Sequence, residues 1–297
     1  MSTEPKSPSP RMPITDLAEM KRRGDRIVMI TAYDAPSARL ADAAGVDLIL
    51  VGDSAGNTML GYDTTVPATL AEMLMLSAAA ARGRERALLI ADMPFGSFQV
   101  SDEEAVRNAV AFTKADADAV KLEGAGPMLP RVRAIVGAGI PVMGHIGLTP
   151  QSATMPGGFK AQGRTGVKAR ALFADALALQ QAGCFAIVLE AVPARVAARI
   201  TAGLRIPTIG IGAGVECDGQ VLVWHDLLGI GKGRSPRFVK RYGEVGAEIQ
   251  RAIETYAVEV RSGAFPGPEH TYNIPDEEFE IFSSEFEAAV PAGEDWL

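Results

Sequence analysis

The sequence Asp47-Leu48-Ile49-Leu50-Val51-Gly52-Asp53-Ser54 decides how the whole chain is interpreted. It is a short run of apolar and β-branched residues that stops at a glycine, a carboxylate and a hydroxyl. A continuous apolar run of this length is typical of a strand buried on both faces, as in parallel sheets. An unpaired carboxylate is costly to bury, so Asp53 at the end of such a strand is either paired with a cation or, if other strands end in the same way, part of a functional site.

Three later runs end in the same way, at Asp92, Glu123 and Glu190. Strands and amphipathic helices alternate between these points. The expected strands are 26–32, 47–52, 87–92, 119–123, 141–146, 185–190, 207–212 and 221–225. The expected helices are 14–24, 35–44, 70–82, 102–115, 129–138, 167–182, 195–202 and 237–262.

Eight strands alternating with helices predict an α/β fold, a (β/α)8 TIM barrel. The alternative is an open doubly wound sheet, which favours a glycine-rich fingerprint directly after the first strand. Residues 31–34 are not such a fingerprint, so the barrel is preferred. One feature fits a barrel poorly, since residues 213–220 leave no room for a full helix between the last two strands.

Composition divides the chain into a leader, residues 1–13, a catalytic domain, residues 14–265, and an acidic tail, residues 266–297. The leader is rich in Pro and Ser and is expected to be disordered. Residues 262–297 hold nine acids and no Lys or Arg, so the rest of the chain carries 29 basic against 27 acidic residues. A nearly neutral core argues against nucleic acid as a partner. The tail is expected to be a partly disordered, solubilising extension.

Two features indicate a cytoplasmic protein that does not cross a membrane. The apolar stretches are shorter than the roughly 18 to 20 residues that a membrane helix needs. The chain has only two cysteines, Cys184 and Cys217. We expect them at opposite ends of the sheet, about 20 Å apart, and therefore as free thiols in a reducing compartment.

The carboxyl ends of barrel strands are where catalytic residues collect. This rule brings a set of polar side chains to one rim: Asp53, Ser54, Asp92, Glu123, His145 and Glu190. Lys121 lies two residues before Glu123, so both side chains point to the same side of their strand. A lysine that points into a barrel needs a carboxylate or an anionic ligand beside it.

Several acids in one small space repel one another unless a cation lies between them. Carboxylate oxygens with few histidines favour a hard ion such as Mg²⁺, and no Cys or His pair has the spacing of zinc ligands. His145 is either a structural histidine or a ligand contact, and His225, at the end of the last strand, has the same two interpretations. Glu190 comes from a strand beyond the acid cluster and is the acid most available to act as a base.

Two glycine-rich loops have two interpretations each. Residues 209–214 resemble a barrel phosphate loop, or else the glycines allow a close backbone approach to a ligand or neighbour. Residues 156–165 form a polar loop with two cations inside, either a lid that closes over an anion or an ordinary surface loop.

A set of motifs from about residue 14 to 272 closely resembles the ketopantoate hydroxymethyltransferase family. These motifs are Val51-Gly52-Asp53-Ser54, Ala91-Asp92-Met93-Pro94-Phe95, Lys121-Leu122-Glu123-Gly124, Gly144-His145-Ile146-Gly147-Leu148-Thr149-Pro150-Gln151, Gly157-Gly158-Phe159-Lys160, Leu189-Glu190-Ala191-Val192-Pro193 and Ile209-Gly210-Ile211-Gly212-Ala213-Gly214 with Asp218-Gly219-Gln220. The resemblance implies a Mg²⁺-dependent (β/α)8 barrel of the phosphoenolpyruvate mutase/isocitrate lyase superfamily. It also implies transfer of a hydroxymethyl group from 5,10-methylenetetrahydrofolate to 3-methyl-2-oxobutanoate, which gives ketopantoate for pantothenate and coenzyme A biosynthesis.

By this resemblance, Asp53, Asp92 and Glu123 hold the metal, directly or through water, and Glu190 removes the C3 proton of the ketoacid. The ketoacid chelates the ion and is bound by a group of residues that includes Asp53, Ser54, Asp92, Lys121 and His145. The resemblance further implies a homo-oligomer, a decamer of two pentameric rings. Tyr62 stands where the family has a histidine, and the tail after about residue 273 lies outside the resemblance.

Two rival functions remain. The first is another Mg²⁺-dependent C–C lyase of the same superfamily, but those lyases carry a catalytic cysteine on a loop near strand five, and neither cysteine here lies there. The second is a catalytically inactive barrel that serves as a scaffold, and the intact set of acids with Lys121 argues against it.

Overall fold

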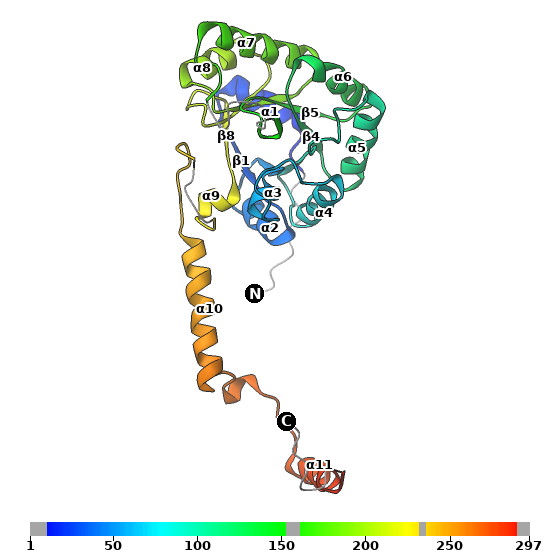
Figure 1. Ribbon diagram of the computed structural model, residues 1–297, viewed down its shortest axis with the longest axis vertical. Coiled ribbons are helices and arrows are strands. Elements are labelled where there is room, and N and C mark those ends of the chain that lie inside the picture. The colour runs from blue at the N-terminus through cyan, green and yellow to red at the C-terminus, as the bar shows by residue number, and fades with distance from the viewer. Residues whose placement is uncertain (1–10, 153–160, 232–235, 290–297) are drawn as a thin grey trace, which may run out of the picture. The chain divides into compact units, whose positions relative to one another are not determined.

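A computed structural model describes residues 11–152, 161–231 and 236–289 of the chain. Eight strands form one closed barrel, in which each strand pairs with the next and β8 pairs in parallel with β1 (Figure 1). The strands are β1 (Ile27–Thr31), β2 (Leu48–Val51), β3 (Leu88–Asp92), β4 (Ala119–Glu123), β5 (Val142–Gly147), β6 (Ala186–Glu190), β7 (Thr208–Ile211) and β8 (Gly219–Leu222). The predicted (β/α)8 barrel is confirmed, and the doubly wound sheet is wrong.

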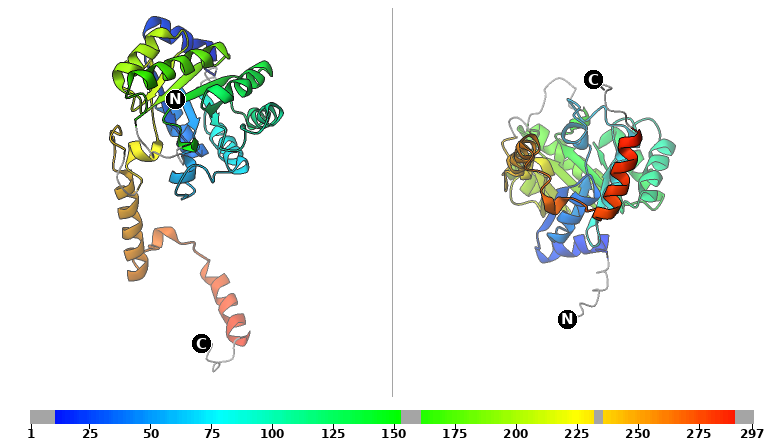
Figure 2. Two further views of the ribbon diagram at one scale, coloured as in Figure 1. Left: turned by 45° about the horizontal axis from the view of Figure 1, so that its top comes forward. Right: turned by 90° about the horizontal axis from the view of Figure 1, so that it is seen from below.

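Most helices of the barrel unit lie around the strands (Figure 2), whereas Leu17 of the first helix packs into the interior cluster. The helices of this unit are α1 (Ile14–Arg23), α2 (Ala35–Ala43), α3 (Ala55–Thr58), α4 (Leu70–Ala81), α5 (Asp102–Lys114), α6 (Leu129–Gly137), α7 (Gly166–Gln181), α8 (Ala194–Gly203) and α9 (Trp224–Leu228). Short 3-10 turns lie at η1 (Gly126–Met128) and η2 (Pro150–Ser152). Side-chain caps set several starts: Thr69 and Glu72 form a capping box on α4, and Ser101 accepts from the Glu104 N–H on α5.

Side chains alternate between the interior of the barrel and the layer beneath the helices. Leu48 and Leu50 of β2 belong to the cluster that fills the barrel, while Ile49 and Val51 belong to the larger cluster under the helices. Leu17 of α1 joins the interior cluster. Val120 and Leu122 belong to the cluster under the helices, so Lys121 and Glu123 face the interior, and the prediction that these two share one side of β4 is confirmed.

The last strand was predicted two residues too late, at 221–225. β8 begins at Gly219, where a Cβ atom would lie 2.5 Å from the Ile27 carbonyl oxygen, so only glycine permits this approach of β8 to β1. After Val223 the chain turns into α9, and the backbone N–H of Trp224 donates to the Thr31 hydroxyl at 2.9 Å. His225 therefore lies in a helix and does not end a strand.

The predicted helix 237–262 is also wrong in its first part, because α10 begins only at Val245. Tertiary contacts hold residues 237–244 in a loop. The Phe238 ring lies against Gly212, and the Tyr242 N–H donates to the Leu227 carbonyl at 2.8 Å. These contacts outweigh the helical pattern of the segment.

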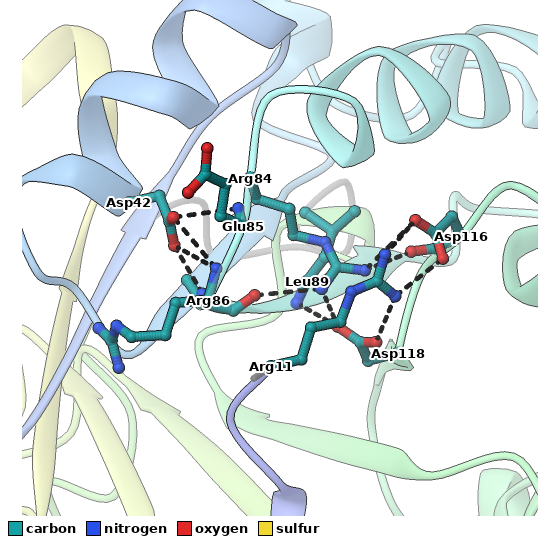
Figure 3. Close-up of polar contacts among 9 residues, drawn as sticks. Arg11, Asp42, Arg84, Glu85, Arg86, Leu89, Asp116 and Asp118 are labelled. Atoms are coloured by element: carbon teal, nitrogen blue, oxygen red, sulfur yellow. Dashed lines mark hydrogen bonds and ion pairs between the residues drawn. The ribbon is translucent and has the colours of Figure 1, made fainter. Parts of the chain in front are cut away.

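Charged side chains tie the amino ends of the strands together (Figure 3). The Asp42 carboxylate accepts hydrogen bonds from the backbone N–H groups of Glu85, Arg86 and Ala87 just before β3, and these bonds outweigh burial and lower its pKa. The buried Arg84 guanidinium pairs with Asp118 at 2.6 Å.

The same network holds the start of the described chain. Arg11 pairs with Asp116 at 2.8 Å, and the Met12 N–H donates to the Arg86 carbonyl at 3.0 Å, so these two residues of the predicted leader contact the barrel. This end of a (β/α)8 barrel serves stability and leaves the carboxyl ends of the strands for chemistry.

Both cysteines are buried free thiols, as predicted. Their predicted placement was wrong, because they do not lie at opposite ends of the barrel. Cys184 lies two residues before β6. Cys217 lies two residues before β8, and its thiol hydrogen-bonds Thr201 and Thr208, of which Thr208 is the first residue of β7. The chain returns to the amino end within 213–218, a path that the sequence did not reveal.

The chain divides into two compact units after Glu244. The second unit holds α10 (Val245–Ser262), η3 (Pro268–His270) and α11 (Asp276–Ala289), a helix that the composition of the tail did not indicate. Among the described helices, none has the length and apolar character required to cross a membrane.

Candidate active site

A cavity of about 910 Å³ opens at the carboxyl ends of the strands. Every side chain that the sequence placed on this rim lines it: Asp53, Ser54, Asp92, Lys121, Glu123, His145 and Glu190. The structure thus brings together residues that are up to 137 positions apart in the chain (190 − 53).

The first group of side chains comes from β2, β3 and β4. Lys121 Nζ lies 2.8 Å from Asp92 Oδ2, and the same oxygen accepts a hydrogen bond from the Asp53 N–H at 3.1 Å. The other oxygen of Asp92, Oδ1, and Asp53 Oδ2 are buried and have no hydrogen-bond partner within the described part of the chain. Two unpartnered carboxylate oxygens on adjacent strands are poised to accept a ligand.

Burial and neighbouring charges together set the pKa values of this group. Burial raises the pKa of Asp92 to about 7, against the lowering effect of Lys121, and the nearby charges of Asp53 and Glu123 add to the rise. Burial also opposes the charge of Lys121, but Asp92, Glu123 and Asp53 together outweigh it and raise the pKa of the lysine. Lys121 therefore stays charged and partly neutralises the acids.

The second group places His145 between two carboxylates. Its Nδ1 lies 3.2 Å from Glu123 Oε1, and its Nε2 lies 3.2 Å from Glu190 Oε2. Burial and the charge of Lys121 lower the pKa of His145, yet the two glutamates outweigh them and raise it to about 9. Lys121 Nζ is also 3.3 Å from Nδ1, but this nitrogen cannot accept from Lys121 while it is protonated. The flanking carboxylates favour the protonated ring.

Gly147 sets the distance between the ends of β5 and β6. Its φ is +102°, and a Cβ atom at this position would overlap the Glu190 carbonyl oxygen. That oxygen accepts the Leu148 N–H at 2.8 Å. On the other side, Ala191 has φ +49°, an unusual value for a residue with a side chain. Glu190 is thus held from both sides. Sequence analysis missed Gly147 as a positioning residue, although it lies within the motif 144–151.

Gln151 is a second positioning residue that was missed. Its backbone N–H donates to Glu123 Oε2 at 3.0 Å, and its side-chain amide donates to the Met93 carbonyl at 3.0 Å. It connects the loop after β5 to the ends of β3 and β4. The only signal in the sequence was its place in the motif 144–151.

Ser54 is positioned by a chain of hydrogen bonds that begins at β1. The buried Tyr33 hydroxyl lies 2.9 Å from Ser54 Oγ, and the Thr31 hydroxyl donates to the Tyr33 oxygen at 2.9 Å. Thr31 in turn accepts the Trp224 N–H. Ser54 is therefore linked to the first residue of α9.

The profile of the family described as Ketopantoate hydroxymethyltransferase matches residues 11–268. The chain belongs to this family. A relative from Nitratidesulfovibrio vulgaris (strain DP4), named 3-methyl-2-oxobutanoate hydroxymethyltransferase, is 54% identical over 283 residues, 95% of this chain and 92% of the relative. One of the same name from Heliobacterium modesticaldum is 56% identical over 87% of this chain and 94% of the relative. The first match extends into the tail, beyond the limit of about residue 273 that the resemblance suggested.

Solved structures of lower identity confirm the fold of this family member. A phosphonopyruvate hydrolase in complex with oxalate and Mg²⁺ has a TM-score of 0.56 at 14% identity, covering 93% of this chain and 97% of that one. 2,3-Dimethylmalate lyase, described as a member of the PEP mutase/isocitrate lyase superfamily, has a TM-score of 0.56 at 17% identity, covering 94% and 98%. The barrel therefore shares the fold of these enzymes.

The glycines of 209–214 serve close packing in this member of the ketopantoate hydroxymethyltransferase family. A Cβ at Gly212 would lie 2.7 Å from the Phe238 ring, and one at Gly214 would lie 2.5 Å from the Ala194 Cβ. Of the two interpretations of this loop, approach to a neighbour is the one that these contacts favour.

Three other sequence interpretations have clear outcomes. His225 lies against the Tyr33 ring, with centroids 5.6 Å apart, and is not among the cavity-lining residues. Tyr62 donates to Glu72 Oε1 at 2.7 Å and also lies outside the cavity wall. Residues 156–160 of the proposed lid (156–165) lie outside the described residues, and of the remaining part Ala161 lines the cavity.

Proposed function

We propose that this protein transfers a hydroxymethyl group from 5,10-methylenetetrahydrofolate to 3-methyl-2-oxobutanoate with the help of Mg²⁺, giving 2-dehydropantoate for pantothenate and coenzyme A biosynthesis. One observation carries the proposal. One cavity holds buried carboxylate oxygens of Asp53, Asp92 and Glu123 that accept no hydrogen bond within the described part of the chain, together with a separate carboxylate, Glu190. The family membership and the names of the relatives support the choice of substrate.

The residues fit a hard divalent cation. No three His, Cys, Asp or Glu side chains in the described part of the chain are grouped closely enough to hold an ion by themselves. Mg²⁺ commonly takes only one or two carboxylates and completes its shell with water and substrate oxygens. Asp53 and Asp92 would hold the ion, and Glu123, whose Oε2 already accepts from Gln151, would act through water. When bound, the cation supplies positive charge that stabilises the developing negative charge on the ketone oxygen.

The protein's own side chains orient the ketoacid and move its proton. Lys121 and Ser54 offer a cation and a hydroxyl to its carboxylate and ketone oxygens. Glu190 removes the proton from C3, and His145, 3.2 Å away, fixes the orientation of that carboxylate. The C3 carbon then forms a bond to the methylene carbon of the folate, and both carbon–nitrogen bonds of that methylene break. A water molecule supplies the hydroxyl oxygen, and the C3 proton and the other water proton end on the two folate nitrogens.

The metal requirement is the direct test of this proposal. We expect removal of divalent ions with a chelator to lower turnover of 3-methyl-2-oxobutanoate and methylenetetrahydrofolate by about 100-fold or more, because several kcal/mol of charge stabilisation is lost. Added Mg²⁺ should restore the rate. Deuterium exchange at C3 of the ketoacid, measured without folate, should show the same dependence. No turnover and no exchange in the presence of Mg²⁺ would refute the proposed hydroxymethyl transfer.

We further propose that the protein is a cytoplasmic homo-oligomer, with a decamer of two pentamers as the form expected from the resemblance, and that it has neither nucleic acid nor a membrane as a partner. The helix α10 supports an oligomer. Ile249, Ile253, Tyr256 and Val260 recur at helical spacing, and all four are at least 46% exposed. An exposed apolar face of this length is typical of an interface between chains.

Mass measurement by light scattering tests the oligomer. The full chain, 31.3 kDa, should elute as a multiple of that mass. Ile253→Asp should shift the mass toward the single chain, since it places a charge in the apolar face. Gln250→Asp adds the same charge at a polar position of α10 and should leave the mass unchanged. A wild-type mass of one chain would contradict the proposal.

A further inference from the structure

One sector of the cavity wall has no role in the ketoacid chemistry described above. The acids come from β2 to β4 and the base from β6, whereas this sector is built by β7, β8, α9 and the loop at 236–238. Its floor is apolar, formed by Ile211, Val221 and Val223. Cavities of roughly 300–1,000 Å³ accommodate drug-sized ligands, so a five-carbon ketoacid leaves most of this one, about 910 Å³, unfilled.

Asp226 of α9 is the acid of this sector. It lines the cavity and is half-buried, and burial raises its pKa against the effects of His225 and Arg241. Its carboxylate accepts no hydrogen bond from any residue that the structure describes. The adjacent His225 ring lies against Tyr33, so it does not compete for this acceptor.

The loop at 236–238 adds an aromatic ring and a cation. Phe238 is fixed against Gly212, which leaves room for the ring because it has no Cβ. Arg237 is exposed and lines the same cavity, and it has no ion pair within residues 11–152, 161–231 and 236–289. An apolar floor, an aromatic ring, a carboxylate and a cation therefore line one cavity.

We propose that this wall binds the folate co-substrate: Asp226 accepts two hydrogen bonds from its pterin ring, Phe238 packs on that ring, and Arg237 pairs with its glutamate carboxylates. The inference deepens the proposed function and depends on it. A reduced pterin presents a ring N–H beside an exocyclic amino group, two parallel donors that match the two oxygens of one carboxylate. Aromatic rings pack favourably on flat heterocycles, and a guanidinium binds carboxylates in a bidentate manner.

The position of α9 relative to the ketoacid supports this assignment. Trp224, two residues before Asp226, donates to Thr31, which is joined through Tyr33 to Ser54. In Figure 1, α9 lies beside β1 and β8, and Thr31, the last residue of β1, accepts the hydrogen bond from α9. The same hydrogen bonds therefore position the Ser54 hydroxyl, which binds the ketoacid, and the helix α9, which carries Asp226. They fix the position of one substrate site relative to the other.

Binding titrations with tetrahydrofolate and with 6-methyltetrahydropterin, which lacks the glutamate, separate the two contacts. Asp226→Asn should weaken both ligands by about 10- to 100-fold, because each carries the donor pair. Arg237→Gln should weaken tetrahydrofolate by about 10-fold and leave 6-methyltetrahydropterin unchanged. Glu216→Gln, an exposed acid outside the cavity wall, is the matched control and should change neither affinity.

Deuterium exchange at C3 of the ketoacid, measured without folate, separates this inference from the proposed function. Exchange at the wild-type rate in Asp226→Asn shows that the variant is folded and that the ketoacid site is intact. Unchanged affinity for both ligands in that variant would overturn the role of Asp226. Equal weakening of both ligands by Arg237→Gln would overturn the role of Arg237. Absence of exchange in the wild-type protein would instead refute the proposed function itself.

Discussion

Glu190→Gln is expected to lower C3 proton exchange of 3-methyl-2-oxobutanoate by about 10²- to 10⁴-fold, the usual contribution of a general base. The amide has nearly the same size as the carboxylate but cannot take a proton at neutral pH. The amide oxygen can take the position of Glu190 Oε2, 3.2 Å from His145 Nε2, so the geometry of the site is preserved. Binding of the ketoacid in the presence of Mg²⁺, measured by calorimetry, should remain within a few-fold of the wild-type value.

A control variant tests whether the loss of one negative charge anywhere on the protein is enough to slow exchange. Glu85→Gln removes the same charge at an exposed residue near the amino ends of the strands and should exchange normally. Wild-type exchange in Glu190→Gln would move the base to another residue of the cavity. Loss of ketoacid binding in that variant would show instead that Glu190 holds the substrate.

Gly147→Ala should produce a comparable loss of activity by a different route. The added Cβ would overlap the Glu190 carbonyl oxygen, and φ at this position is +102°, which residues with side chains rarely adopt. The backbone must therefore shift, and it carries Glu190 and His145 with it. Displacements of about 1 Å in a catalytic group cost on the order of 100-fold in rate, so kcat should fall by at least that factor.

Gly139→Ala is the control that introduces backbone strain without the overlap with a neighbouring atom that Gly147→Ala would cause. Gly139 has φ +85°, and a Cβ atom added there would have no neighbouring atom within 4 Å, so alanine introduces only the strain. We expect it to lose about 1 kcal/mol of stability and to keep full activity. Thermal unfolding and steady-state kinetics on both variants make the comparison. Equal kinetic losses at the two positions would contradict the role assigned to Gly147.

Much of the fold was predictable because its strands are buried on both faces. Seven of the expected strands overlap the observed ones closely, since short apolar runs such as Leu48–Val51, bounded by turn residues, are typical of strands buried on both faces. The end of β8 was not predictable. Val221 to Trp224 is an equally apolar sequence, and the strand ends where it does because Trp224 donates to Thr31, 193 residues earlier.

The same distinction applies to the site. The acids were predictable, because strand ends converge on one rim and alternation orients Lys121 with Glu123. Their supports were not. Tyr33 supports the site through the contact of its hydroxyl with Ser54, 21 residues away. Gly147 supports it through its close approach to the Glu190 carbonyl oxygen. The opposite-ends placement of the cysteines failed for the same reason, since no local pattern shows that 213–218 returns to the amino end.

The hydrogen bonds from Trp224 through Thr31 and Tyr33 to Ser54 have a consequence for synthesis of the protein. They cross the seam where the last strand meets the first, and this seam runs beside the catalytic rim. A nascent chain that has emerged only as far as β7 already contains Asp53, Asp92, Glu123 and Glu190. Its Ser54 hydroxyl still lacks the support of α9. Catalytic competence is therefore acquired late on the ribosome, when the barrel closes.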